Sequence, residues 1–315
     1  MAPSAIRRRL FVVGGAMLVA FTSIAVCSKT GRGSRPQPPV RTYHFSVDDV
    51  TDILKDLAAK PYRSMFEQPA LHFLRQLHQR YGTNTSLYVF YKGDSFDLTQ
   101  MPTRYKQEFT DNADWLKLGF HSFDKHTRYL GENDACARRA QRDYRLVAKQ
   151  ISRFAGERTL ASFVRLHLWY ASDRALRSLR KVGLRGILVK SEQEGHKGSG
   201  TADPQSRHES RGVTWSVDES TGVAMIATDL AFEQVPPIAL EDHLAKLKPE
   251  DLGTFEGFVH EPFLNIRGTR NCLEKAAKLL GERGYVPVHY GEVIMSAALP
   301  SPSSPAAIPL ARSPR

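Results

Sequence analysis

Polar side chains that can bind a metal or transfer a proton follow several predicted strands of this sequence. Asp48 and Asp49 come directly after the first strand, and His121 follows the third. His167 lies near the end of the fourth strand, and His260 ends a late one. Because the carboxyl ends of parallel strands meet at one edge, we expect these groups to lie together. Some of them can bind a divalent metal, and the remaining two can act as a general acid and a general base.

The adjacent carboxylates Asp48 and Asp49 suit two different roles. Consecutive residues that leave a strand point to opposite sides, so one can bind a metal while the other activates a water. A second interpretation is that one of them only caps the helix expected over residues 50–58. Capping needs one acid rather than two, which favours the functional interpretation.

Strand and helix patterns alternate along the chain. Short apolar runs predict strands over residues 43–47, 86–91, 115–120, 160–168, 186–189, 213–217, 223–228, 255–260 and 285–289. Apolar residues at helical spacing predict helices over residues 50–58, 66–81, 134–154, 173–182, 240–247 and 268–284. This order predicts an α/β domain with a largely parallel sheet, either a barrel or a doubly wound sheet.

The composition is that of a globular protein, with 41% hydrophobic and 24% charged residues. It excludes a disordered chain, a collagen-like repeat and a small disulfide scaffold. The net charge is +11, but nine positive charges lie in residues 1–43 and the last twenty residues, which hold no acid. The nearly neutral centre has no basic stripe with interleaved aromatics, so we expect no nucleic-acid partner. Its cysteines, Cys136 and Cys272, either pair or are separate buried thiols.

Both ends of the chain have compositions that do not build a core. Residues 1–27 join an arginine triplet to an apolar run, which is typical of a signal peptide or an uncleaved signal anchor. We therefore expect export, with the protein periplasmic, extracellular or anchored to a membrane through this segment alone. Residues 28–41 are a Gly/Pro/basic linker, and residues 299–315 are a Pro/Ser-rich tail. A single domain remains over residues 42–298.

Three segments around the candidate residues, FSVDDV, LGFHSFDKH and FVHEPF, resemble the polysaccharide deacetylase family, carbohydrate esterase family 4 with the NodB-homology fold. The likeness covers most of residues 43–290. It implies a distorted (β/α) barrel of about seven parallel strands. It also implies a hydrolase that uses a divalent metal, expected to be zinc, to remove N-acetyl groups or acetyl esters from a glycan. By the same resemblance, Asp48 is the general base, Asp49 and His121 are metal ligands and His260 is the general acid.

The third metal ligand is open between two histidines. The family has histidine ligands four residues apart, but Lys125 occupies that place here and His126 stands five residues after His121. Five residues on a helix separate side chains by about 140°, so His126 can join His121 only across a loop or bulge. The alternative is His167, in a segment where the family often has an Arg- and Pro-rich motif and this chain has no proline. The other interpretation is that neither histidine binds a metal. His126 would then be an exposed loop residue, and His167 would pack against its aromatic neighbours.

Other side chains near these motifs also have two interpretations. Trp169 and Tyr170 can stack on a sugar ring of the substrate or belong to the core. Glu261 can orient His260 or face solvent.

The assignments predict hydrolysis without a serine nucleophile, and the chain has no G-x-S-x-G string. Asp48 would take a proton from a water, and protonated His260 would donate one to the leaving amine or alcohol. One alternative is a non-catalytic carbohydrate-binding or surface protein, favoured by the broken histidine spacing. Another is a different metal-dependent amidase or a glycoside hydrolase. A glycosidase needs two carboxylates about 5–10 Å apart, which neighbours in sequence suit poorly.

Overall fold

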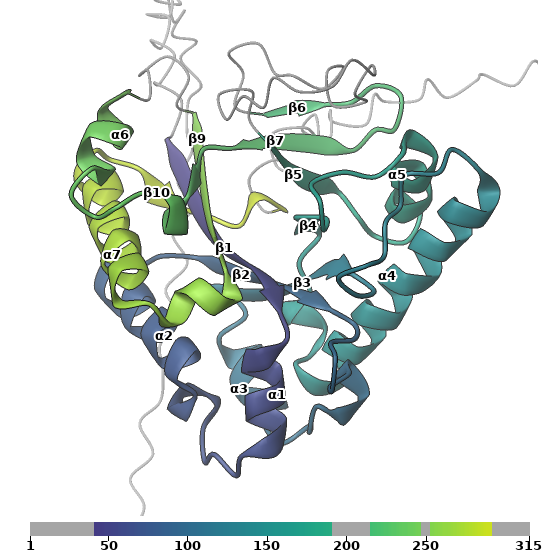
Figure 1. Ribbon diagram of the computed structural model, residues 1–315, viewed down its shortest axis with the longest axis horizontal. Coiled ribbons are helices and arrows are strands. Elements are labelled where there is room, and N and C mark those ends of the chain that lie inside the picture. The colour runs from purple at the N-terminus through teal and green to yellow at the C-terminus, as the bar shows by residue number, and fades with distance from the viewer. Residues whose placement is uncertain (1–40, 191–214, 247–252, 292–315) are drawn as a thin grey trace, which may run out of the picture. The chain divides into compact units, whose positions relative to one another are not determined.

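The computed structural model of this protein describes three stretches of the chain, residues 41–190, 215–246 and 253–291 (Figure 1). The expected signal segment 1–27 and tail 299–315 lie outside them, as does the linker 28–41 apart from Arg41. The interpretations of these segments stay predictions. Among the helices of the described stretches, none is both long and apolar enough to cross a membrane.

The strands form two sheets, in which every pair but one is parallel. The first sheet has the order β3-β2-β1-β9-β8, with β10 paired to β1. Its strands are β1 (Thr42–Val50), β2 (Thr85–Phe90), β3 (Leu116–Ser122), β8 (Leu230–Ala231), β9 (Thr254–His260) and β10 (Val286–Pro287). The second sheet has the order β4-β5-β7-β6, and its β6–β7 pair is antiparallel. Its strands are β4 (Phe163–Val164), β5 (Gly186–Lys190), β6 (Trp215–Val217) and β7 (Ala224–Thr228).

The two sheets meet without a continuous hydrogen-bonded ladder. Leu118 of β3 makes one parallel bridge to Leu160, ahead of β4, and β7 continues through Asp229 into β8. Among the described strands, hydrogen bonding therefore closes no ring. The prediction of an α/β fold with a parallel central sheet is confirmed, but the barrel is not.

Helices lie alongside the strands in two main groups (Figure 1). Helix α7 contacts α2 and α6, and α4 packs against α5. The helices are α1 (Asp52–Ala59), α2 (Pro69–Tyr81), α3 (Lys106–Asp111), α4 (Asp134–Phe154), α5 (Asp173–Arg180), α6 (Leu240–Lys246) and α7 (Arg267–Glu282). Short 3-10 helices are η1 (Met65–Glu67), η2 (Leu98–Gln100), η3 (Glu157–Thr159), η5 (Phe232–Gln234) and η7 (Glu261–Asn265). The sequence pattern missed α3, because Phe109 is its one buried residue.

Strand β4 differs most from its prediction. It keeps only two residues of the expected 160–168, and His167 lies in a turn beyond it. The turn forms because Leu168 and Trp169 have left-handed φ angles of 63° and 75°, which extended backbone does not allow. Of the two alternatives for the cysteines of the domain, the structure has separate buried thiols, since Cys136 and Cys272 are both buried and free.

Alternate residues of β1 face different surroundings, as a strand requires. Phe45 and Val47 belong to the hydrophobic core. His44, Ser46 and Asp48 lie on the other face and are equally buried, but each makes a polar side-chain contact there. The interior side of this strand is therefore polar along its length, and it leads to the candidate site.

Candidate metal centre

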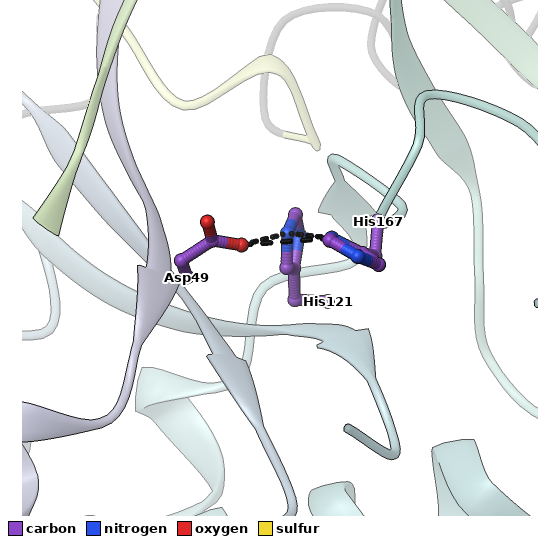
Figure 2. A group of neighbouring side chains, drawn as sticks. All are labelled: Asp49, His121 and His167. Atoms are coloured by element: carbon purple, nitrogen blue, oxygen red, sulfur yellow. Dashed lines mark hydrogen bonds and ion pairs between the residues drawn. The ribbon is translucent and has the colours of Figure 1, made fainter. Parts of the chain in front are cut away.

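Three side chains from separate parts of the fold converge on one point (Figure 2). Asp49 comes from β1, His121 from β3 and His167 from the turn after β4. Asp49 Oδ1 lies 3.0 Å from His121 Nε2 and 3.5 Å from His167 Nδ1. The two histidine nitrogens are 3.3 Å apart.

These spacings fit a small divalent cation. Ligands at about 2.0–2.1 Å from a tetrahedral zinc ion lie about 3.3–3.4 Å from one another. The three donor atoms have separations of 3.0–3.5 Å, so one ion can reach all of them with little movement. Two imidazoles and one carboxylate leave a fourth position for water or substrate, as in catalytic zinc sites.

Both imidazoles are held with the correct nitrogen toward the site. His121 Nδ1 is 2.6 Å from the carbonyl oxygen of Arg165, and His167 Nε2 is 3.1 Å from that of Lys125. A carbonyl only accepts, so each of these nitrogens donates its hydrogen outward. The nitrogen that faces Asp49 is then free to bind a metal in each ring. The ring of Phe90 also packs against both imidazoles, with its centre 5.0 Å from that of His121 and 5.1 Å from that of His167.

A local irregularity in β1 directs Asp49 toward the histidines. Its φ angle is 62°, in the left-handed region, and the β1–β2 register shifts between Val47 and Val50. Such a bulge turns a side chain that regular alternation would place elsewhere. A left-handed aspartate costs free energy, and strain of this kind concentrates at functional sites. The two adjacent carboxylates thus reach different partners, Asp48 in the interior and Asp49 at the candidate site.

The structure brings His167 to the site and leaves His126 out of it. The backbone N–H of His167 donates to the carbonyl oxygen of His121, which fixes the turn against β3. The side chain of His126 is exposed, and its backbone N–H donates to Asp124 in a tight turn. The third side chain at the candidate site is therefore His167, from a different segment, rather than His126.

Asp48 is buried and paired with a buried arginine. Arg165 Nη1 lies 3.2 Å from each carboxylate oxygen of Asp48, and both residues are at most 2% exposed. Burial raises the pKa of Asp48 above its usual value, although the charge of Arg165 opposes this. Sequence reasoning did not assign Arg165 a role. The available signal was a charged residue inside the apolar run 163–168.

His260 is paired with Glu233, which the sequence analysis also missed. Glu233 Oε1 lies 2.5 Å from His260 Nδ1 and is almost fully buried. Burial alone would lower the pKa of His260, but the hydrogen bond and charge of Glu233 outweigh it and raise that pKa. His260 also pairs in register with Asp48 across β1 and β9. Glu233 lies in η5, 27 residues earlier, so no local pattern links the two.

Neither Asp48 nor Asp49 caps α1, and Glu261 does not orient His260. The carboxylate of Glu261 instead accepts hydrogen bonds from the backbone N–H groups of residues 51, 52 and 53, at 2.6–2.9 Å. It occupies the position of an N-cap, where the backbone N–H groups of a helix lack partners. Both aspartates are thereby left for other roles.

Trp169 is half-buried and lies next to Arg165. Its ring stands edge-on to Phe258, and the Arg165 guanidinium lies 4.9 Å from the ring centre. Tyr170 follows it and is also half-buried. Trp169 is thus part of the wall over the Asp48–Arg165 pair, and substrate contact by either aromatic stays a prediction.

Fold and site together define an α/β protein with a candidate site for one divalent metal, beside an Asp–Arg pair and a His–Glu pair. No family model matches the chain, and no curated protein matches it. Its chain path is similar to those of several solved structures.

A CE4 family pseudoenzyme from Bacillus anthracis is 9% identical, with a TM-score of 0.46 over 82% of this chain and 66% of that one. A family 4 acetyl xylan esterase from Clostridium thermocellum, in complex with a cobalt ion, is 14% identical, with a TM-score of 0.45 over 82% and 93%. A peptidoglycan N-acetylglucosamine deacetylase is 10% identical, with a TM-score of 0.46 over 80% and 87%. Similarity at this level carries no functional argument.

Proposed function

We propose that this protein is an exported, metal-dependent hydrolase that removes acetyl groups from a glycan. The main support for metal dependence is that Asp49, His121 and His167 converge. Each offers one ligand atom, at separations that suit a small cation. The glycan and the acetyl group come from the resemblance of the three sequence motifs. Export comes from the N-terminal segment.

Asp48 and His260 have the environments of a base and an acid. A divalent metal bound by the three ligands would polarise the acyl carbonyl and acidify a water. Asp48 takes the water proton, and Arg165 holds both oxygens of its carboxylate in place. His260 donates a proton to the leaving amine or alcohol. Glu233 supports this role because it favours the protonated imidazole.

Metal content of the full chain is the first test. We expect about one equivalent of zinc or another divalent ion in the wild-type protein, and loss of it in Asp49→Ala and His121→Ala. His167→Ala should lose it as well. His126→Ala is the matched control, since it removes a nearby exposed histidine, and it should keep the metal. A folded wild-type protein that takes up no metal after incubation with zinc would refute the site.

Product analysis separates the remaining functions. Acetate released from acetylated xylan or chitin oligomers, and lost in Asp48→Asn, supports the deacetylase. Free sugar without acetate would instead indicate a glycoside hydrolase. A metal-loaded chain that binds these glycans and releases neither product would be the non-catalytic binding protein that the altered histidine spacing favours.

A further inference from the structure

A cavity lies at the amino ends of the central strands, away from the metal ligands at their carboxyl ends. It has a volume of about 220 Å³. His44 and Ser86 line it from near the starts of β1 and β2, and Lys117 lines it from the start of β3. His44 and Asp48 are four residues apart on β1, about 13 Å along the strand, and the metal ligand Asp49 follows Asp48.

Four polar residues from neighbouring strands of the first sheet lie side by side on its inner face. His44 of β1 pairs with Glu256 of β9. On the other side of β1, Ser86 of β2 pairs with Ser46, two residues from His44, and with Lys117 of β3. Residues two apart on a strand share a face, so Glu256, His44, Ser86 and Lys117 form a row across the sheet.

The first three members of this row are connected by hydrogen bonds. Ser86 Oγ lies 2.9 Å from His44 Nε2, and His44 Nδ1 lies 2.8 Å from Glu256 Oε2. A carboxylate only accepts, so His44 Nδ1 donates to Glu256, and Nε2 of the neutral ring accepts from the Ser86 hydroxyl. This is the arrangement in which a histidine activates a serine and an acid fixes the histidine tautomer.

The acid of this array is itself held in place. Glu256 Oε1 accepts from Ser46 Oγ at 2.9 Å and from Arg165 Nη2 at 3.0 Å, which leaves Oε2 for His44. His44, Ser86 and Glu256 are each at most 2% exposed. Glu256 is not among the residues that line this cavity, so it is a positioning residue.

A further buried group lines the cavity with an unused polar atom. His289 is 6% exposed, and its Nε2 has no hydrogen-bond partner among the described residues. Burial, with smaller contributions from His44 and Lys117, lowers the pKa of His289 well below its usual value, so its ring is neutral at pH 7. A buried unpaired nitrogen costs free energy unless something else binds it. The cavity is therefore equipped for a small polar molecule.

We propose that Ser86 is an activated nucleophile in a second, metal-independent site that accepts short acyl groups from esters. The volume suits an acetyl-sized acyl group with a small alcohol. Lys117 also lines the cavity, and its Nζ donates to the carbonyl oxygen of Arg158 at 2.8 Å. This site is separate from the proposed deacetylase and does not depend on it.

Ester hydrolysis at this site would proceed through an acyl-serine. Ser86 Oγ bonds to the ester carbonyl carbon while its proton moves to His44 Nε2. The bond from that carbon to the alcohol oxygen breaks, and the alcohol leaves with the proton from His44. Water then attacks the acyl-serine, gives a proton to His44, and the carboxylic acid leaves as Ser86 regains its proton.

The test is acetylation of the full chain by p-nitrophenyl acetate after metal removal with a chelator. We expect one acetyl group on the peptide that contains Ser86, found by mass spectrometry of the digested wild-type protein. Ser86→Ala should lose it, and His44→Gln should slow its formation at least about 100-fold. Ser162→Ala is the matched control, because Ser162 is another serine that lines the same cavity and belongs to none of the hydrogen bonds of this array, and Ser86 should still be acetylated in it.

Two results would overturn the proposal. One is a Ser86 peptide that stays unmodified in the wild-type protein while surface lysines react. The other is acetylation of Ser86 at the same rate in His44→Gln. Asp49→Ala keeps the two proposals apart, since it removes a metal ligand and should leave Ser86 acetylation unchanged.

Discussion

The pairing of His260 with Glu233 gives a sharp prediction for Glu233→Gln. The substitution keeps the shape of the side chain but removes the charge that lies 2.5 Å from His260 Nδ1. A hydrogen bond to a charged group contributes about 1.5–3 kcal/mol, and we take the lower end because solvent screens the pair. His260 is 37% exposed, which is why this discount applies. Loss of this interaction should lower the pKa of His260, because the protonated ring loses its charged partner.

Glu233→Gln should change how both activity and stability depend on pH. Glu233 raises the pKa of His260, so the acid form persists to higher pH in the wild-type protein. In Glu233→Gln the basic limb of the pH profile of kcat/KM should therefore move to lower pH. The pair should also stabilise the fold fully below about pH 6.5, the unfolded pKa, and lose this contribution as pH rises through the folded pKa.

The assay is titration of the His260 ring by NMR in the full chain, which needs neither metal nor substrate. Glu241→Gln is the control, because Glu241 is an exposed glutamate on α6 and its loss should not move the His260 titration. An unchanged or raised pKa of His260 in Glu233→Gln would refute the assignment of Glu233 as the residue that keeps the acid protonated.

Three further substitutions test other parts of the site. Arg165→Met leaves Asp48 and Glu256 as buried carboxylates without their cation, so denaturant unfolding should show a loss of about 3–5 kcal/mol. Glu261→Ala leaves three backbone N–H groups at the start of α1 without their acceptor and should cost about 1–2 kcal/mol in the same assay. Asp49→Asn keeps a residue that tolerates the left-handed φ, so the thermal transition should hardly move. Calorimetric titration with zinc should nevertheless show an affinity at least about 10-fold lower; an unchanged affinity would exclude Asp49 as a ligand.

The sequence by itself predicted the alternation of strands and helices, because apolar periodicity is a local property. It placed α4 over residues 134–154, where a cap at Asn133 and a buried stripe agree. It also predicted that Asp48, Asp49, His121 and His260 would follow strands that meet at one edge. This prediction required only the positions of the strand ends and a parallel sheet. The apolar runs indicate the first, and the alternation of strands and helices indicates the second.

Only the tertiary structure decided which groups are partners. His167 rather than His126 lies beside Asp49 and His121, because the chain leaves β4 early, turns at Leu168 and Trp169, and holds the His167 backbone against β3. Glu233 reaches His260 from 27 residues away, and Arg165 reaches Asp48 from 117. Such contacts depend on register between strands and on how the chain turns after them. No local pattern of residue types encodes either, so the ligand set and the paired charges appear only when the sheet is assembled.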